Sequence, residues 1–205
     1  MAALIPVNNP DFVLTGQAQV WWKPWIFGTP AALPADTLLL GDAWTSPWKA
    51  VGATKEGVSA RFDRTVTNIT VEEVSQPVDQ RTSSSGFTFT MQLSEDTLDT
   101  MLLAYGGGTI TTLAAAAGTK GKKTLVIAEE VDYISIGLES MAAPREAVTS
   151  ETPWRRMVID KVSSAAQVET AYRRAANQRV YPVTFTSLTP IADCPIVELD
   201  ADATP

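Results

Sequence analysis

The sequence contains no histidine and only one cysteine, Cys194, among its 205 residues. Without histidine the chain lacks the most common general base, the Ser-His-Asp type of triad and most kinds of zinc site. One cysteine cannot form an intrachain disulfide, which is compatible with a reducing cytoplasm. With no histidine to activate it, Cys194 is interpreted as an inert thiol. We therefore predict no catalytic residue, no metal ligand and no cofactor.

Long hydrophobic runs are also missing, and none approaches the roughly 18 apolar residues of a membrane-spanning helix. The first residues lack the basic and apolar regions of a signal peptide, so we expect neither segment. The glycines at 106–108 are not followed by the lysine of a phosphate-binding loop. Adjacent acidic residues at 72–73 and 129–130 point to opposite faces of a strand, so neither pair forms a carboxylate dyad.

What the chain does contain is a sizeable apolar fraction with frequent breaks. Hydrophobic residues make up 45% and charged residues 19%, which permits a buried core. Thirteen prolines and twelve glycines favour many short elements over long helices. The net charge is −7 with a pI near 4.6, and an acidic chain is poorly suited to gripping phosphate. The length fits a single domain with extensions, or at most two small domains.

Residues 1–50 are rich in proline and hold five of the six tryptophans. Residues 11–15 and 17–22 are predicted as short extended segments, and the prolines exclude a regular helix. Two interpretations are open for the tryptophans. The segment is an arm that needs another surface to cover its aromatic side chains, or the tryptophans pack on the chain's own core.

A β pattern begins at Gly57, where apolar and polar residues alternate through Phe62 and again through 87–93. This period of two, with β-branched and aromatic residues, is typical of half-buried strands. Between them, the polar residues 75–86 are predicted as a long loop that is either mobile or used for contact. A helix is predicted at about 95–105, with Ser94 as its N-cap and the glycines at 106–108 as its end. Its expected apolar face consists of Leu98, Met101, Leu102 and Tyr105.

Further strands are predicted at 124–128, 131–138, 154–162 and 180–188, with Glu129 and Glu130 in a turn. Residues 114–123 are interpreted as a flexible connection with a solvated lysine cluster. Residues 163–177 fit either a helix or a strand. The acidic end of the chain, 201–205, is expected to fray.

Several weak motifs occur in a characteristic order. Val51-Gly-Ala-Thr-Lys-Glu-Gly-Val leads into a strand, and Gln76-Pro-Val-Asp, Leu93-Ser-Glu-Asp-Thr-Leu and the late Tyr181-Pro-Val-Thr-Phe follow. Together, over roughly residues 48–110 and 155–200, this order resembles the major tail (tail-tube) proteins of siphophages. The long Trp- and Pro-rich first 50 residues depart from that family.

The resemblance implies a mainly β fold: two packed antiparallel sheets forming a barrel-like sandwich, with one flanking helix. The whole chain, 1–205, would be one tail-tube domain, with an N-terminal arm and first strands at 1–50 and the core at 51–200. It implies a structural virion subunit, not an enzyme, whose hexameric rings stack into a tail tube. Its expected partners are further copies of itself, the tape-measure protein, the tail terminator and the baseplate or distal tail proteins. The tube would be assembled in the host cytoplasm, away from any membrane, and DNA would pass through it without specific binding.

An acidic lumen would repel DNA and let it slide. The hypothesis for lumen-lining residues comprises Glu72, Glu73, Asp79, Glu129, Glu130 and Asp132. The hypothesis for inter-subunit contacts comprises Trp21, Trp22, Trp25, Val78, Arg81 and Ser84.

Three alternatives stay open at the level of sequence. A β-sandwich interaction module is one, with Trp21, Trp22 and Trp25 stacking on sugar rings. An enzyme that uses carboxylates alone is another. A secretion-system ring protein would share the tube-forming role and much of the fold.

Overall fold

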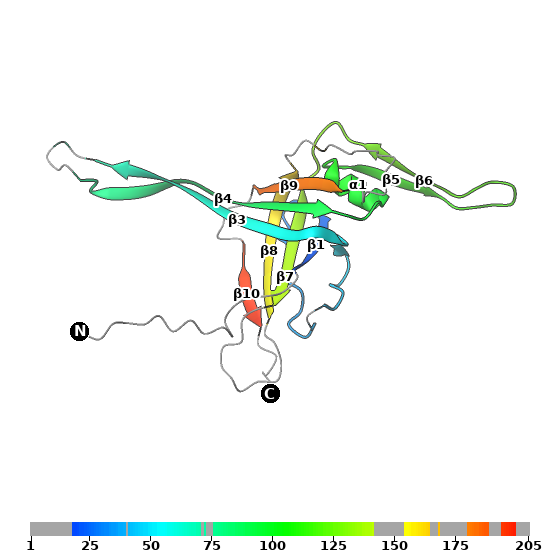
Figure 1. Cartoon of the computed structure of the whole chain (residues 1–205), viewed down its shortest axis with the longest axis horizontal. Helices are drawn as coiled ribbons and strands as arrows, with labels where there is room; N and C mark the ends of the chain where they lie inside the picture. The colour runs from blue at the N-terminus through cyan, green and yellow to red at the C-terminus, as the bar shows by residue number, and fades with distance from the viewer. Residues whose placement is uncertain are drawn as a thin grey trace.

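The computed structural model describes residues 18–39, 41–70, 72, 76–141, 154–164, 168, 180–188 and 194–199. This part of the chain is mainly β, with one short helix (Figure 1). The elements in chain order are β1 Ala18–Pro24, β2 Lys49–Ala50, β3 Thr54–Ile69, β4 Asp79–Leu93, α1 Leu98–Ala104, β5 Gly108–Leu113, β6 Lys122–Ile127, β7 Ile134–Met141, β8 Trp154–Ser164, β9 Tyr181–Ser187 and β10 Ile196–Leu199. The predicted fold class, mainly β with antiparallel sheets and one helix, is confirmed.

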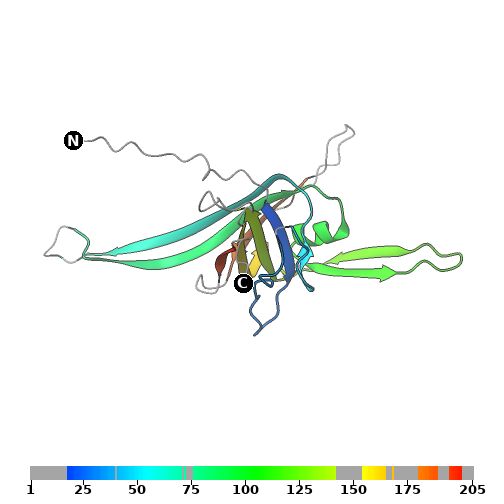
Figure 2. The same cartoon turned by 90° about the horizontal axis from the view of Figure 1, so that it is seen from below.

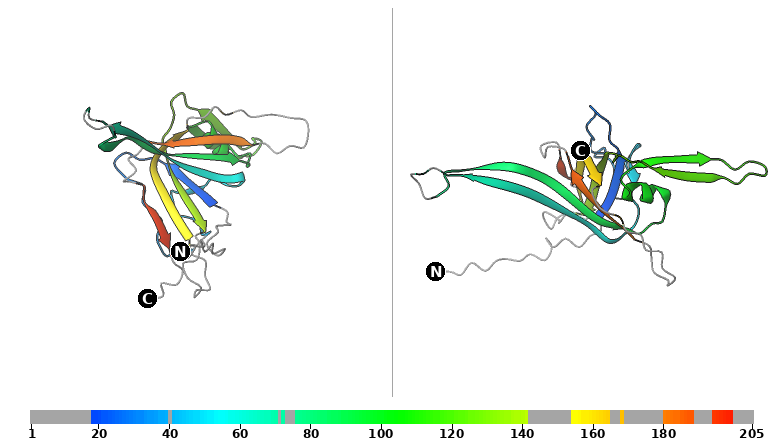
Figure 3. Two further views of the ribbon diagram at one scale, coloured as in Figure 1. Left: turned by 60° about the vertical axis from the view of Figure 1, so that its left-hand side comes forward. Right: turned by 90° about the horizontal axis from the view of Figure 1, so that it is seen from above.

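Eight strands form one antiparallel sheet in the order β2-β1-β7-β8-β9-β4-β3, with β10 pairing β8. Strands β8 and β9 pair through only three residue couples, at the ends of the two strands. The sheet bends there, so β1, β7 and β8 cross behind β9, β4 and β3 as two layers (Figure 3). Over the described residues the sheet ends at β2 and β3 and does not close into a barrel. The second sheet is the hairpin of β5 and β6.

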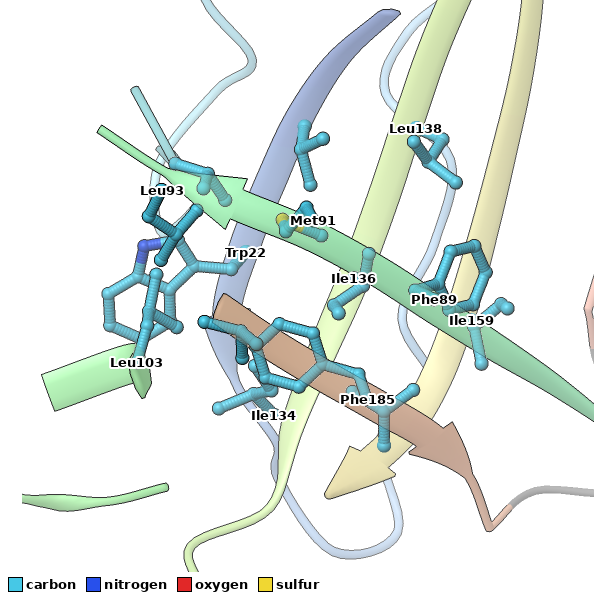
Figure 4. Packing of buried hydrophobic residues seen from close by; sticks show 14 of the residues in the cluster. Trp22, Phe89, Met91, Leu93, Leu103, Ile134, Ile136, Leu138, Ile159 and Phe185 are labelled. Carbon is cyan, nitrogen blue, oxygen red and sulfur yellow. The ribbon is translucent and has the colours of Figure 1, made fainter. Parts of the chain in front are cut away.

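The main core lies between the two layers and is closed at one end by α1 (Figure 4). One layer contributes Trp22 and Ile136, and the other contributes Phe89, Tyr181 and further apolar side chains. Both tyrosine and phenylalanine are fully buried. Every second residue of β9 and of the Phe87–Leu93 part of β4 points into this core, which explains the strict alternation in these sequences.

The opposite face of β7 and β8 is covered by the Pro- and Trp-rich segment that follows β1. Trp44 stacks on Trp21 with ring centroids 5.7 Å apart, and both are buried with Val158. Gly137 lies beneath the Trp44 ring and leaves no room for a Cβ atom. Both faces of β7 are therefore buried. For Trp21, Trp22 and Trp44, packing on the chain's own core is the interpretation that holds.

The helix begins later than predicted. Its N-cap is Thr97, whose hydroxyl accepts a hydrogen bond from the Thr100 amide at 3.1 Å. The predicted cap, Ser94, instead donates its hydroxyl to the Ala53 carbonyl, and Glu95 accepts from the Ala53 amide. The most buried helix residues are Thr100, Leu103 and Ala104, while the predicted apolar face is only half-buried. The predicted end is correct, because the amides of Gly106 and Gly107 donate to carbonyls of the last turn.

The loop predicted at 75–86 is wrong over most of its length, because β4 already begins at Asp79 and its residues 79–86 pair with β3, with one irregularity between Thr65 and Val66. The outer parts of these two strands are exposed on both faces. Their side chains are therefore polar like those of a loop, and composition alone does not distinguish the two. Predictions for residues 11–15, 201–205 and most of 163–177 lie outside the described residues. Within that last segment, Ser163 and Ser164 belong to β8.

Candidate functional site

The first candidate surface is the outer part of the β3–β4 hairpin, the described residues between Phe62 and Phe87, which we call the acidic-tipped arm. Beyond Phe87, β4 has lost its pairing with β9 and contacts only β3. Eight residues of β3 in an extended conformation reach about 24 Å from the body. Figures 1 and 2 show the arm projecting well clear of the two layers.

The root of this arm is fixed to the body through β9. The Phe87 amide donates to the Ser187 hydroxyl at 2.8 Å, and the Phe87 ring packs against Phe62 and Phe89. Farther out, the large apolar side chains Val66 and Val78 are 44% and 53% exposed. The arm is thus firmly rooted and open to contact along its length.

The second candidate surface is the β5–β6 hairpin, residues 108–127, which we call the basic arm. At its root, directly after α1, the backbone of the glycines at 106–108 packs closely against Asp132 and β6. The Gly108 amide donates to Asp132 Oδ2 at 2.9 Å, and the Asp132 amide donates to the Gly106 carbonyl at 2.8 Å. At Gly107 and Gly108, with φ of 143° and 140°, a Cβ atom would collide with Asp132 and with the β6 backbone.

The basic arm also exposes apolar side chains. Leu113, Val126 and Ile127 are 59%, 60% and 53% exposed. Leu113 pairs with Lys122, and Val126 lies four pairs further toward the root on the same face. An isolated two-stranded hairpin is only marginally stable in water. Both arms therefore have the character of segments that gain stability from a neighbour.

The two arms leave opposite sides of the body (Figures 1 and 2). In addition, β3 is the terminal strand of the eight-stranded sheet, so its outer edge has no strand partner among the described residues. Such an edge offers unpaired backbone groups to another chain. The candidate contact surfaces thus lie at the extremities of the molecule, whereas both faces of β7 in the body are covered.

No protein-family model matches the chain, and no curated protein matches its sequence.

The predicted lumen-lining residues fall into two separate places. Glu72 and Asp79 lie at the outer end of the acidic-tipped arm, and Glu73 lies outside the described residues. Glu129, Glu130 and Asp132 follow β6, on the side of the basic arm. Asp132 has a local task, since its carboxylate holds the Gly108 amide. A single chain therefore does not gather these carboxylates into one patch.

The predicted contact residues also divide. Trp21 and Trp22 are 7% and 4% exposed and have little surface left for a second subunit. Trp25 is half-buried and donates its indole N–H to Asp160 at 2.9 Å. By contrast, Val78, Arg81 and Ser84 are all exposed on the acidic-tipped arm.

A groove of about 730 Å³ separates the basic arm from the body, lined by parts of α1, β1, β5 and β7. Trp25 and Tyr133 contribute aromatic rings to it, but Lys161 Nζ already lies 4.3 and 3.9 Å from their centroids. Over the described ranges, no group of three or more acidic or cysteine side chains could hold a metal ion. No helix in those ranges is long and apolar enough to cross a membrane.

Two structural features were not anticipated from sequence. The strand predicted at 124–128 corresponds to most of β6, but its partner β5 was not predicted, and residues 114–123 between them were interpreted only as a flexible connection. The buried ion pair between Glu139 and Arg156, with Arg156 Nε donating at 2.8 Å, was also missed. Its only signal was an acidic residue inside an otherwise apolar strand.

Proposed function

We propose that this chain is a structural virion subunit of a long-tailed phage, which forms rings that stack into the tail tube. The tail-tube version of the fold, with a barrel-like sandwich completed by neighbouring copies, belongs to this proposal. So do the hexameric ring, the tape-measure protein inside it, and the terminator and distal tail proteins at its ends. The order of sequence motifs suggests the family, and the shape of the molecule suggests how it would assemble.

The observation that carries the proposal is the pair of exposed hairpin arms on opposite sides of a body whose central strand β7 is covered on both faces. Each arm exposes large apolar side chains and gains little stability from its own chain. Because the two arms are different surfaces, a contact made by one does not satisfy the other. Since the arms leave opposite sides of the body, contacts made through both of them run head to tail, and repeated contacts of this heterologous kind produce closed rings or open filaments.

The acidic net charge of −7 also fits a conduit for DNA. A basic lining would bind phosphate by counterion release and hold the DNA in place. Which carboxylates face the lumen depends on how the copies are arranged, so Glu72, Asp79, Glu129 and Glu130 remain candidates for this role. Asp132 is the weakest candidate because its carboxylate is used within the chain.

Negative-stain electron microscopy of the purified protein over a range of concentrations tests the proposal. We expect rings or tubes of uniform width. A variant in which an Asn-Gly turn joins Phe62 directly to Phe87 removes the acidic-tipped arm while keeping a two-residue hairpin. It should stay folded by circular dichroism and form no tubes. Monomers of the full chain at every concentration and salt would contradict the proposed function.

A further inference from the structure

Charge is segregated between the two arms. The basic arm, residues 108–127, carries Lys120, Lys122 and Lys123 and no acidic residue, although the chain as a whole has a net charge of −7. All three lysines are exposed. This arm is therefore a positively charged projection from an acidic protein.

The end of the other arm has the opposite charge. Residues 65–80 contain three acidic residues and no lysine or arginine. Two of the three, Glu72 and Asp79, are described and exposed. Beside Asp79 lies Val78, which is 53% exposed, so the end of the arm offers an apolar side chain next to its carboxylates.

Within one chain these opposite charges do not meet. The arms point away from one another on either side of the body (Figures 2 and 3). The ion pairs among the described residues join Lys49 to Asp99, Arg61 to Asp63 and Arg156 to Glu139, and none uses the charges at the arm ends. Complementary surfaces that a single molecule keeps apart can be satisfied by a second molecule.

We propose that the end of the acidic-tipped arm of one copy docks on the basic arm of the next copy. The inference rests on the proposed function in that its partner is another subunit of the same tube. One face of the basic arm presents Lys122 together with the exposed Leu113 and Val126. That mixture matches the carboxylates and Val78 of the incoming arm in both charge and apolarity. Each copy gives one arm and receives one, so the contact is head to tail.

The contribution of charge to this contact can be bounded. An exposed ion pair strengthens association by a factor of about two to five, so two pairs contribute a factor of roughly four to twenty-five. Solvent-exposed charges are screened over about 8 Å at physiological ionic strength and over about 3 Å at 1 M salt. Assembly should therefore need a higher protein concentration as salt is raised.

A charge exchange tests the docking. The variants are E72K/D79K, whose arms are both basic, and K122E/K123E, whose arms are both acidic. Each alone should need at least about tenfold more protein to assemble than wild type, because like charges then face one another. An equimolar mixture, and the fourfold variant with all the changes, should assemble at near the wild-type concentration. The control is Lys55→Glu at the body end of β3, which should assemble like wild type.

Pelleting assays and sedimentation velocity give the critical concentrations, negative stain shows the product, and thermal melts check that each variant is folded. Folded variants that assemble like wild type, or a mixture that fails to restore assembly, would overturn the docking and leave the proposed function standing. Conversely, wild-type chains that grow head to tail in a charge-dependent way but form neither rings nor tubes would contradict the proposed function and retain the docking.

Discussion

Replacing Arg156 with methionine removes the central cation of a buried network on the outer face of the sheet. The guanidinium is 1% exposed and donates three hydrogen bonds: to Glu139 Oε1 at 2.8 Å, to the Ala35 carbonyl at 3.1 Å and to the Leu38 carbonyl at 2.6 Å. It thereby fastens the segment that covers β7 and β8. Among the described residues, Glu139, with no exposed surface, would keep only the Gly41 amide at 3.2 Å as a partner.

The expected loss follows from that geometry. Removing one partner of a buried ion pair leaves an uncompensated charge and costs about 3–5 kcal/mol. Since single domains are stable by about 5–15 kcal/mol, the Arg156→Met variant should be close to marginal stability. By comparison, Arg155→Met changes an exposed neighbour on the same strand and should cost less than about 1 kcal/mol.

Urea unfolding followed by tryptophan fluorescence measures the change, with constant m-values as the check on two-state behaviour. The double variant Glu139→Leu/Arg156→Met removes both charges and should lose less than the sum of the two single variants. A loss under about 1 kcal/mol for Arg156→Met, or strict additivity in the double variant, would refute the view that this network holds the covering segment.

Two further substitutions test glycine positions at which neighbouring atoms leave no room for a Cβ atom. Gly137→Ala should destabilise the protein by about 1–3 kcal/mol and alter the fluorescence of Trp44, because the new methyl group meets the indole ring. Ser140→Ala on the same strand is the control. An unchanged melting temperature for Gly137→Ala would contradict the packing. Gly108→Ala should raise the rate of amide hydrogen exchange in β5 and β6 much more than in β7 and β8, since a Cβ atom at this position would meet the Val126 carbonyl. Equal protection of all four strands would show that the root of the basic arm is not fixed there.

Local patterns predicted the strands of the body well. The alternation at Phe87–Leu93 and Tyr181–Ser187 survives in the structure because these strands have one face in the core and one outside it. The end of α1 was predictable because glycine alone tolerates the positive φ of 77° at Gly106. The start of the helix was not, because Ser94 and Glu95 bind a backbone segment more than forty residues away.

The candidate surfaces were harder to predict. An exposed ribbon has no buried face, so residues 79–86 show the composition of a loop while having the pairing of a strand. The tryptophans posed the reverse difficulty. For Trp21 and Trp44 the sequence leaves both an external partner and the chain's own core open, and only the tertiary arrangement shows that they cover one another.

The long ribbon of β3 and β4 has a consequence for how insertions and deletions can change the length of this hairpin. Outside the body, each cross-strand couple is supported only by its neighbours, so couples can be inserted or deleted without repacking the core. Removing one couple shortens the ribbon by about 3.4 Å but turns every remaining outer side chain to the opposite face. Changes that preserve the outward face therefore come in steps of two couples, or about 7 Å. The spacing between neighbouring molecules would be adjustable only in increments of that size.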